Sequence, residues 1–169
     1  LASYAIPGTV VPPWLAEGTA QFMYDGADWD NWDTHRDMIL RDRAMNDNLL
    51  SFTEMNTFGK SGIGNESTYN SGYKLCRFIA LSYGSDKLKE ILMNLSSPFQ
   101  FSVNNAIKKS IGISGDKLYE DFKESLNNGY SLLTNNITKS RSNANNITDK
   151  GTANLHPAWS PDGKKVSYI

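Results

Sequence analysis

Glu17 is the residue whose type and surroundings point most directly to chemistry. It is the single carboxylate in residues 12–22, an otherwise apolar and small-residue stretch that opens with two prolines. Proline suits the first turn of a helix, so this stretch predicts a helix over about 13–24. Helical spacing places Glu17 and Trp14 on a stripe beside the core-facing side, which is predicted to consist of Leu15, Thr19 and Phe22.

The simplest role of Glu17 is electrostatic. A carboxylate in the first turn of a helix interacts favourably with the helix dipole, which contributes about 0.3–1 kcal/mol at an exposed site. Composition by itself favours this role. The periodicity of the stretch assigns Glu17 no other function.

Tyr69 is the second candidate, because it begins a long helical pattern over residues 67–84. On periodicity alone it is a core or edge tyrosine, since aromatic stripes usually serve packing. The pattern ends at Gly84, a typical helix terminator. One continuous face of this helix is formed by Tyr69, Gly72, Tyr73, Cys76, Ile79, Ala80 and Tyr83.

The motif Trp-Leu-x-Glu-Gly-x-Ala at residues 14–20 resembles the second metal-binding segment of the gluzincin metallopeptidases. This class includes the thermolysin-like and aminopeptidase N-like enzymes. The resemblance implies that Glu17 is the third protein ligand of a catalytic zinc. A Tyr-x-x-Gly segment downstream resembles the one whose tyrosine hydroxyl serves the reaction in aminopeptidase N-like enzymes, which implies that role for Tyr69. Those enzymes commonly carry lysine where this chain has Ser71.

Two further ligands of a gluzincin site are the histidines of an H-E-x-x-H helix, whose glutamate is the general base. This sequence contains no H-E-x-x-H, and His35 and His156 are far apart along the chain. His35 is predicted to be an ordinary surface residue. The resemblance places the missing motif upstream of Leu1. We therefore expect the chain to be part of a longer protein and to retain no zinc alone.

Composition excludes several classes of partner and site. The 169 residues carry a net charge of −1, from 17 basic and 18 acidic residues, which leaves no electrostatic footprint for nucleic acid. Cys76 is the single cysteine, so an internal disulfide and a cysteine-built zinc site are excluded. No apolar run is long enough to span a bilayer. A hydrophobic share of 39% is typical of a globular chain.

Helical periodicity continues through most of the chain and predicts a mainly α fold. Further helices are expected at 34–45, 85–96, 101–110 and 114–128, with a loop at 49–64. In the first of these, Met38, Ile39 and Met45 are predicted to be buried. Residues 25–33, rich in Asp and Trp, are predicted to be a solvated loop rather than a calcium site. Under the resemblance, residues 1–132 are the helical C-terminal half of a thermolysin-like catalytic domain.

The C-terminal part changes character. Residues 133–152 are rich in Asn, Ser and Thr and predict a flexible linker. In residues 153–169, Ser160-Pro161-Asp162-Gly163 is a turn signal between two short alternating runs, which predicts a β-hairpin. The phrase resembles the opening of a blade in TolB-type β-propellers. That resemblance implies a second domain cut off after its first hairpin, a possible protein partner, and a periplasmic or exported bacterial setting.

The two resemblances together imply a zinc-dependent metallopeptidase that hydrolyses peptide or protein substrates. In it Glu17 would bind the metal and Tyr69 would act in the transition state. The alternative is a catalytically dead helical scaffold, or interaction domain, attached to a partner-binding propeller. The sequence upstream of this chain distinguishes the two, because only the peptidase requires an H-E-x-x-H helix.

Overall fold

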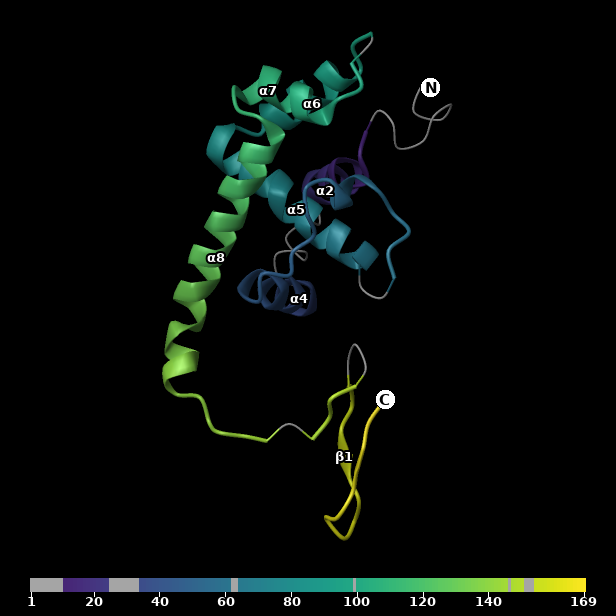
Figure 1. Cartoon of the computed structure of the whole chain (residues 1–169), viewed down its shortest axis with the longest axis vertical. Coiled ribbons are helices and arrows are strands. Elements are labelled where there is room, and N and C mark those ends of the chain that lie inside the picture. The colour runs from purple at the N-terminus through teal and green to yellow at the C-terminus, as the bar shows by residue number, and fades with distance from the viewer. Residues whose placement is uncertain (1–10, 25–33, 62–63, 99, 146, 151–153) are drawn as a thin grey trace. The chain divides into compact units, whose positions relative to one another are not determined.

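The computed structural model describes residues 11–24, 34–61, 64–98, 100–145, 147–150 and 154–169. Within them the chain is mainly helical with one short β-hairpin, as predicted (Figure 1). The segment 25–33, predicted to be a loop, lies outside the described residues. The helices are α2 (Pro13–Met23), α4 (Thr34–Met45), η1 (Glu54–Asn56, a 3-10 turn), α5 (Gly64–Tyr83), α6 (Asp86–Leu95), α7 (Val103–Ile111) and α8 (Gly115–Lys139).

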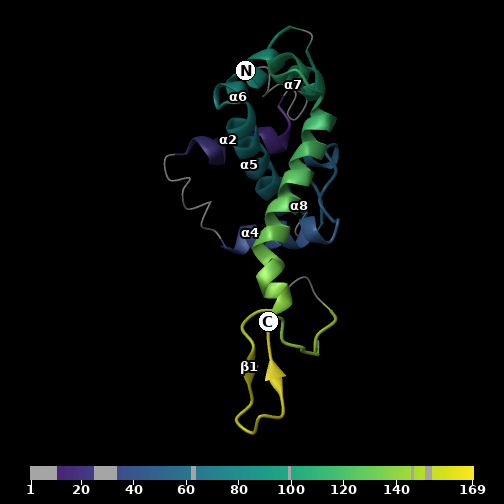
Figure 2. The same cartoon turned by 90° about the vertical axis from the view of Figure 1, so that its left-hand side faces the viewer.

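The chain divides into two compact units, Leu1–Asn135 and Asn136–Ile169. Helix α5 is the central element of the first unit: α2, α4 and α6 all pack against it. Figure 2 shows α2, α5 and α8 close together in this unit. Because neighbours cover it on several sides, α5 buries residues around much of its circumference, among them Leu75, Cys76 and Ile79.

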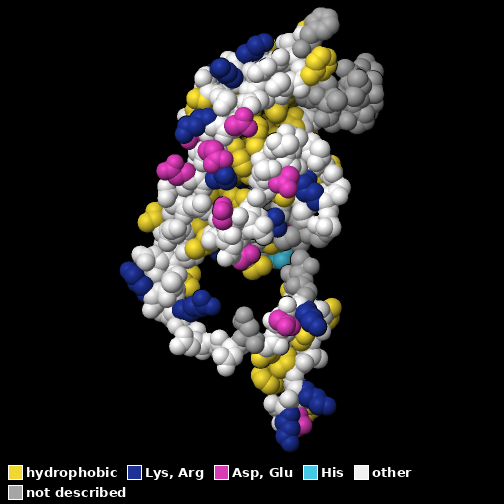
Figure 3. Space-filling model, viewed as in Figure 1, with side chains coloured by type: hydrophobic (Ala, Val, Ile, Leu, Met, Phe, Trp, Pro, Cys, Tyr) yellow, Lys and Arg dark blue, Asp and Glu magenta, His cyan; other side chains and the backbone are white. Residues whose placement is uncertain are grey.

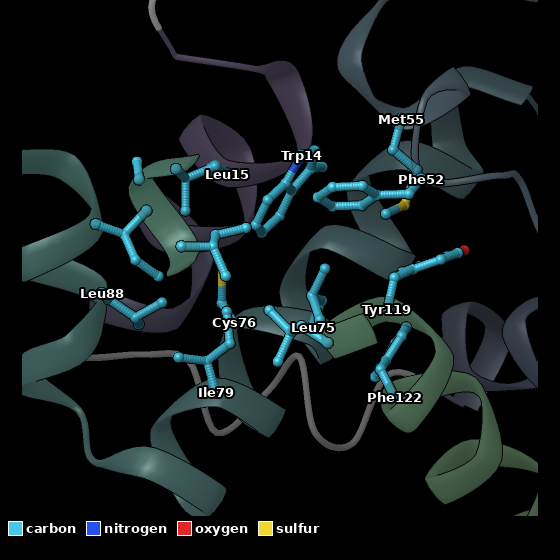
Figure 4. Packing of buried hydrophobic residues seen from close by; sticks show 14 of the residues in the cluster. Trp14, Leu15, Phe52, Met55, Leu75, Cys76, Ile79, Leu88, Tyr119 and Phe122 are labelled. Atoms are coloured by element: carbon cyan, nitrogen blue, oxygen red, sulfur yellow. The ribbon is translucent and has the colours of Figure 1, made fainter. Parts of the chain in front are cut away.

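The core of this unit is built from residues of α2, α5 and α8, and a chain of aromatic rings links α2 to α8 through Phe52, which lies in the loop before η1 (Figure 4). The Trp14 and Phe52 ring centroids lie 5.8 Å apart, those of Phe52 and Tyr119 lie 5.5 Å apart, and those of Tyr119 and Phe122 lie 5.8 Å apart. The Tyr119 hydroxyl donates to the carbonyl of Leu50, which keeps its polar end satisfied inside the core.

The predicted buried faces of α2 and α4 have different outcomes. In α2, Leu15 is fully buried as predicted and Thr19 and Phe22 are half-buried, but Trp14, expected on the stripe beside the core, is fully buried as well. In α4, Met38 and Met45 are each 46% exposed, and the buried residues are Leu40 and Ala44, so the predicted face was wrong. Leu40 and Ala44 pack with Tyr130 of α8, a contact that the period of a single helix does not encode.

Helix α8 is longer than the sequence predicted. Its expected end at residue 128 is passed without a break, and the helix continues to Lys139, so the first part of the predicted linker is helical. The extra turns are held by Tyr130, which is buried and donates from its hydroxyl to Asp37 Oδ1 at 2.9 Å. A tertiary contact therefore overrides the glycine stop signal at Gly129.

The second unit contains the predicted hairpin. Strands β1 (Ala158–Trp159) and β2 (Val166–Ser167) pair antiparallel, with Ala158 opposite Ser167 and Trp159 opposite Val166. In the turn, Asp162 Oδ1 accepts from the Lys164 amide at 3.1 Å. Gly163 has φ 68°, a left-handed conformation that glycine adopts without strain.

Candidate functional site

The position of Glu17 is fixed by the residues that start helix α2 and by one long-range contact of that helix. Pro12 precedes the helix and Pro13 begins it, where no backbone N–H is needed. Glu17 is the fifth residue of α2, and no acidic residue lies in its first turn. The interpretation of Glu17 as a first-turn carboxylate is therefore wrong, because the dipole effect fades beyond that turn. Glu17 is half-buried.

The long-range contact is a crossing of α2 and α5 at two glycines, the most extensive helix pairing among the described elements. A Cβ added to Gly18 would lie 2.5 Å from the carbonyl carbon of Gly72. A Cβ added to Gly72 would lie 2.5 Å from the Trp14 carbonyl oxygen. Both positions are closer than atoms can approach, so the two helices touch backbone to backbone and only glycine fits.

Tyr69 lies one turn before Gly72 on α5 and is half-buried. Its ring stacks on Phe58 with centroids 5.6 Å apart and an interplanar angle of 28°. The loop that carries Phe58 is tied to the start of α5, because Asn65 Oδ1 accepts from the amides of Gly59 and Lys60 at 3.1 and 3.2 Å. Tyr69 is thus an edge tyrosine whose ring is oriented by a loop.

Glu17 directly precedes Gly18 in α2, and Tyr69 lies one turn before Gly72 in α5, so both residues are within one helical turn of the crossing. Gln21, one turn after Glu17, lines a small pocket together with Asn70 and Tyr73 of α5. Tyr73 lies one turn after Tyr69 on the same face of α5. The structure therefore brings the two helix stripes that carry the predicted site residues next to each other.

Sequence reasoning missed the polar groups buried at this crossing. Asn70 is 4% exposed and Ser71 is fully buried, and among the described residues neither side chain has a hydrogen-bond partner. The pocket beside Asn70 has a volume of about 10 Å³, room for about one water molecule. Nothing in residue type or spacing singles out Asn70, because its burial arises only when α2 and α4 close over α5.

Ser71 stands where aminopeptidase N-like enzymes commonly carry lysine, and here it is fully buried. A lysine at this position would have to place its charge in the interior of the helical unit. A buried unpaired ammonium is costly, so this chain's packing requires a small side chain here.

The metal donors present do not by themselves form a zinc site. Among the described residues no three His, Cys, Asp or Glu side chains lie close enough together to hold a metal ion. His35 is exposed on α4, as predicted, and His156 is exposed in the other unit. Burial raises the pKa of the Cys76 thiol to about 12, so it stays protonated and is a poor ligand.

Cys76 instead packs at the crossing, where its Sγ lies 3.7 Å from Thr19 Oγ1. No helix in the described part of the chain is long and apolar enough to cross a membrane. On the face drawn in Figure 3, basic and acidic side chains are interspersed, in keeping with the near-neutral net charge.

The chain was compared with known proteins at the level of families, curated sequences and solved structures. No family model, curated protein or solved structure matches it.

Proposed function

We propose that this chain is the helical portion of a zinc-dependent metallopeptidase of the gluzincin type, which hydrolyses peptide bonds. In this proposal Glu17 supplies one protein ligand to the metal. The H-E-x-x-H helix that supplies the other two lies outside this chain. When bound, the zinc of such a site lowers the pKa of a coordinated water.

One observation carries the proposal: the backbone contact between Gly18 and Gly72. The two segments that resemble gluzincin motifs are far apart in the sequence, and each contains one of these glycines. In this proposal, that contact is what holds the helix segment of Glu17 beside the helix segment of Tyr69. A backbone contact of this kind fixes the placement of the two segments relative to each other.

Tyr69 has the chemistry to assist peptide hydrolysis as a hydrogen-bond donor. Its hydroxyl would donate to the oxyanion that forms when the carbonyl is attacked, a contact typically worth about 3 kcal/mol in the transition state. The stacked Phe58 ring holds the phenol in a defined orientation. Pre-oriented donors are the effective ones, because they need no reorganisation during the reaction.

The hairpin of the second unit fits the proposal that a propeller follows the helical unit. Its apolar side chains are exposed: Trp159 is 71% and Ile169 is 85% accessible. A lone hairpin of this kind is marginal in water, so further strands would have to cover it. A propeller would supply them, and would offer a surface for a protein partner.

The test is zinc content and peptide hydrolysis of the protein taken from its natural start. We expect about one zinc per chain, lost together with hydrolysis in Glu17→Gln. Tyr69→Phe should keep the zinc but lower kcat by about 10²–10³-fold. Glu90→Gln, a carboxylate of α6 paired with Lys87, is the matched control and should change neither.

A protein that binds no zinc, or a Glu17→Gln variant that retains it with full affinity, would contradict the proposal. The helical unit would then be a scaffold or interaction domain. The isolated chain should bind no zinc and cleave no peptide, because Glu17 is the single donor that it contributes to the site.

A further inference from the structure

We propose that a groove between α5 and α8 binds an amphipathic helix of a partner protein, one that carries an acidic residue beside its apolar stripe. Neither Glu17 nor Tyr69 lines this groove. It has a volume of about 240 Å³ and is lined mainly by side chains of these two helices. Figure 2 shows α5 and α8 as neighbours in the first unit.

The walls are two helix faces that approach at one end and leave a gap beyond it. Phe78 of α5 and Phe122 of α8 are in contact, with ring centroids 5.8 Å apart. Farther along α8 the groove is lined by Ser125 and Gly129, where the helix presents almost no side chain. A Cβ added to Gly129 would meet no atom within 4 Å, so the space in front of it is open.

Large apolar side chains border this space without being covered. Leu81 is 73% exposed and Leu133 is 67% exposed, and both line the groove. Two exposed leucines on facing helices, with a hollow between them, form an apolar trough. A volume of about 240 Å³ lies below the roughly 300–1,000 Å³ of typical small-molecule sites, and suits protruding side chains better than a whole ligand.

The dimensions of the walls favour a helix as the occupant. The groove residues of α5 run from Lys74 to Leu81 and those of α8 from Phe122 to Leu133, at helical spacing on each. These stretches correspond to about 10 Å and 16 Å of helix, or two to three turns. A third helix that lays leucine-type side chains at i, i+3 or i+4, and i+7 into the trough would match them.

The charge at the edge of the groove indicates which charge the partner helix should carry. Lys74 is paired with Asp37 at 3.4 Å, but Arg77 has no hydrogen-bond or ion-pair partner among the described residues. The charges of Lys74 and Asp37, which both line the groove, therefore offset each other, and the Arg77 guanidinium is left uncompensated. A carboxylate on the partner helix would form an ion pair with this guanidinium, whose planar set of N–H donors matches the two oxygens of a carboxylate.

The same charge disfavours a second copy of this chain as the occupant. A two-fold dimer across the groove would bring the same surface together on both subunits. Each copy would then bring Arg77 into the interface, but the one carboxylate that lines the groove, Asp37, is already paired with Lys74 and Arg41, so no unpaired carboxylate would meet either guanidinium. We therefore assign the groove to a partner of opposite charge.

The experiment measures binding of a fluorescently labelled helical peptide of about 14 residues, with leucines at helical spacing and glutamates beside them. Its counterpart has lysine in place of each glutamate. The acidic peptide should bind the full chain at least about tenfold more tightly than the basic one, and the difference should shrink at high salt.

Two variants test the place of binding. Gly129→Leu fills the trough and Arg77→Glu reverses the charge at its rim. Each variant should bind the acidic peptide about tenfold more weakly, or weaker still. Asn128→Leu adds the same side chain one position away from the groove, and Lys89→Glu makes the same charge reversal on α6. Both controls should bind as the wild type does. Helix content and the unfolding midpoint of Gly129→Leu, compared with those of the wild type, check that this variant is folded.

Three outcomes would overturn the proposal. The peptides could bind equally well, or not at all. The controls could weaken binding as much as the groove variants, which would indicate non-specific adhesion. The chain could be a dimer by light scattering that Gly129→Leu returns to monomer, in which case the occupant is a second copy.

Discussion

The backbone of Gly18 in α2 lies directly against the backbone of Gly72 in α5, with no room for a side chain on either residue. This contact places fully buried Trp14, Leu15 and Cys76 around the crossing. It is the structural reason that both segments need a glycine at these positions. The stability of the helical unit should therefore respond sharply to a single methyl group there.

Gly18→Ala and Gly72→Ala should each lower the free energy of unfolding by about 1–3 kcal/mol, because a Cβ would force the two backbones apart. Urea unfolding followed by circular dichroism measures the change. The double variant should lose less than the sum of the two, since the first methyl already separates the helices.

Gly129→Ala is the matched control for this prediction. It makes the same change in the interior of α8, but its Cβ would meet open space. We expect it to raise the free energy of unfolding by about 0.5–1 kcal/mol, the ordinary gain in helix propensity. Equal effects of the substitution at Gly18 and Gly129 would refute the close crossing.

Tyr130→Phe should destabilise the unit by about 1–3 kcal/mol, because its hydroxyl donates to the charged carboxylate of Asp37 at 2.9 Å. Helix α8 should also fray beyond that point, which amide hydrogen exchange of residues 130–139 would report. Tyr83→Phe removes a hydroxyl that has no hydrogen bond within the described residues, and should change stability little. A Tyr130→Phe variant as stable as this control would contradict the assignment.

Alkaline pH should weaken the fold. Burial raises the pKa of Tyr119 and of Tyr130 above the ordinary value of 10.0, and the hydrogen bond to Asp37 adds to the effect at Tyr130. The folded chain holds these protons more tightly than the unfolded chain. The two tyrosines therefore contribute fully to the free energy of unfolding below pH 10, and this contribution is lost as pH rises above 10.

Urea unfolding across this pH range measures the loss. Tyr119→Phe/Tyr130→Phe should show a shallower decline above pH 10, leaving the part that arises from Cys76, whose pKa is raised in the same direction. An unchanged decline in the double variant would show that other groups cause it.

Cys76 should resist thiol reagents in the native protein. Its side chain is fully buried, and burial raises the thiol pKa to about 12, so almost no thiolate is present at neutral pH. Labelling with a chromogenic disulfide reagent should be slow until urea unfolds the chain. Gly72→Ala should label faster than the wild type, because it loosens the crossing. Rapid labelling of the native wild type would mean that the α2–α5 contact opens readily.

The candidate site was only partly predictable from the sequence. Pro12, Pro13 and the pattern around Glu17 located the first helix, because local rules for helix starts depend on adjacent residues. They also suggested a first-turn role for Glu17 that its position as fifth residue excludes. Asn70 was not predicted as a site residue. The burial of its side chain without a hydrogen-bond partner among the described residues results from the packing of the helices and not from the neighbouring sequence.

The sequence by itself determined the helices and the hairpin, because helical period and turn residues act over a few positions. Helix α4 spans the predicted 34–45, and the turn at 160–163 closes the predicted hairpin. Only the tertiary structure decided which side of α4 is buried, how far α8 extends and where α2 meets α5. Each of these depends on a contact between distant residues, such as Tyr130 with Asp37 or Gly18 with Gly72, whose free energy exists only once the chain has folded.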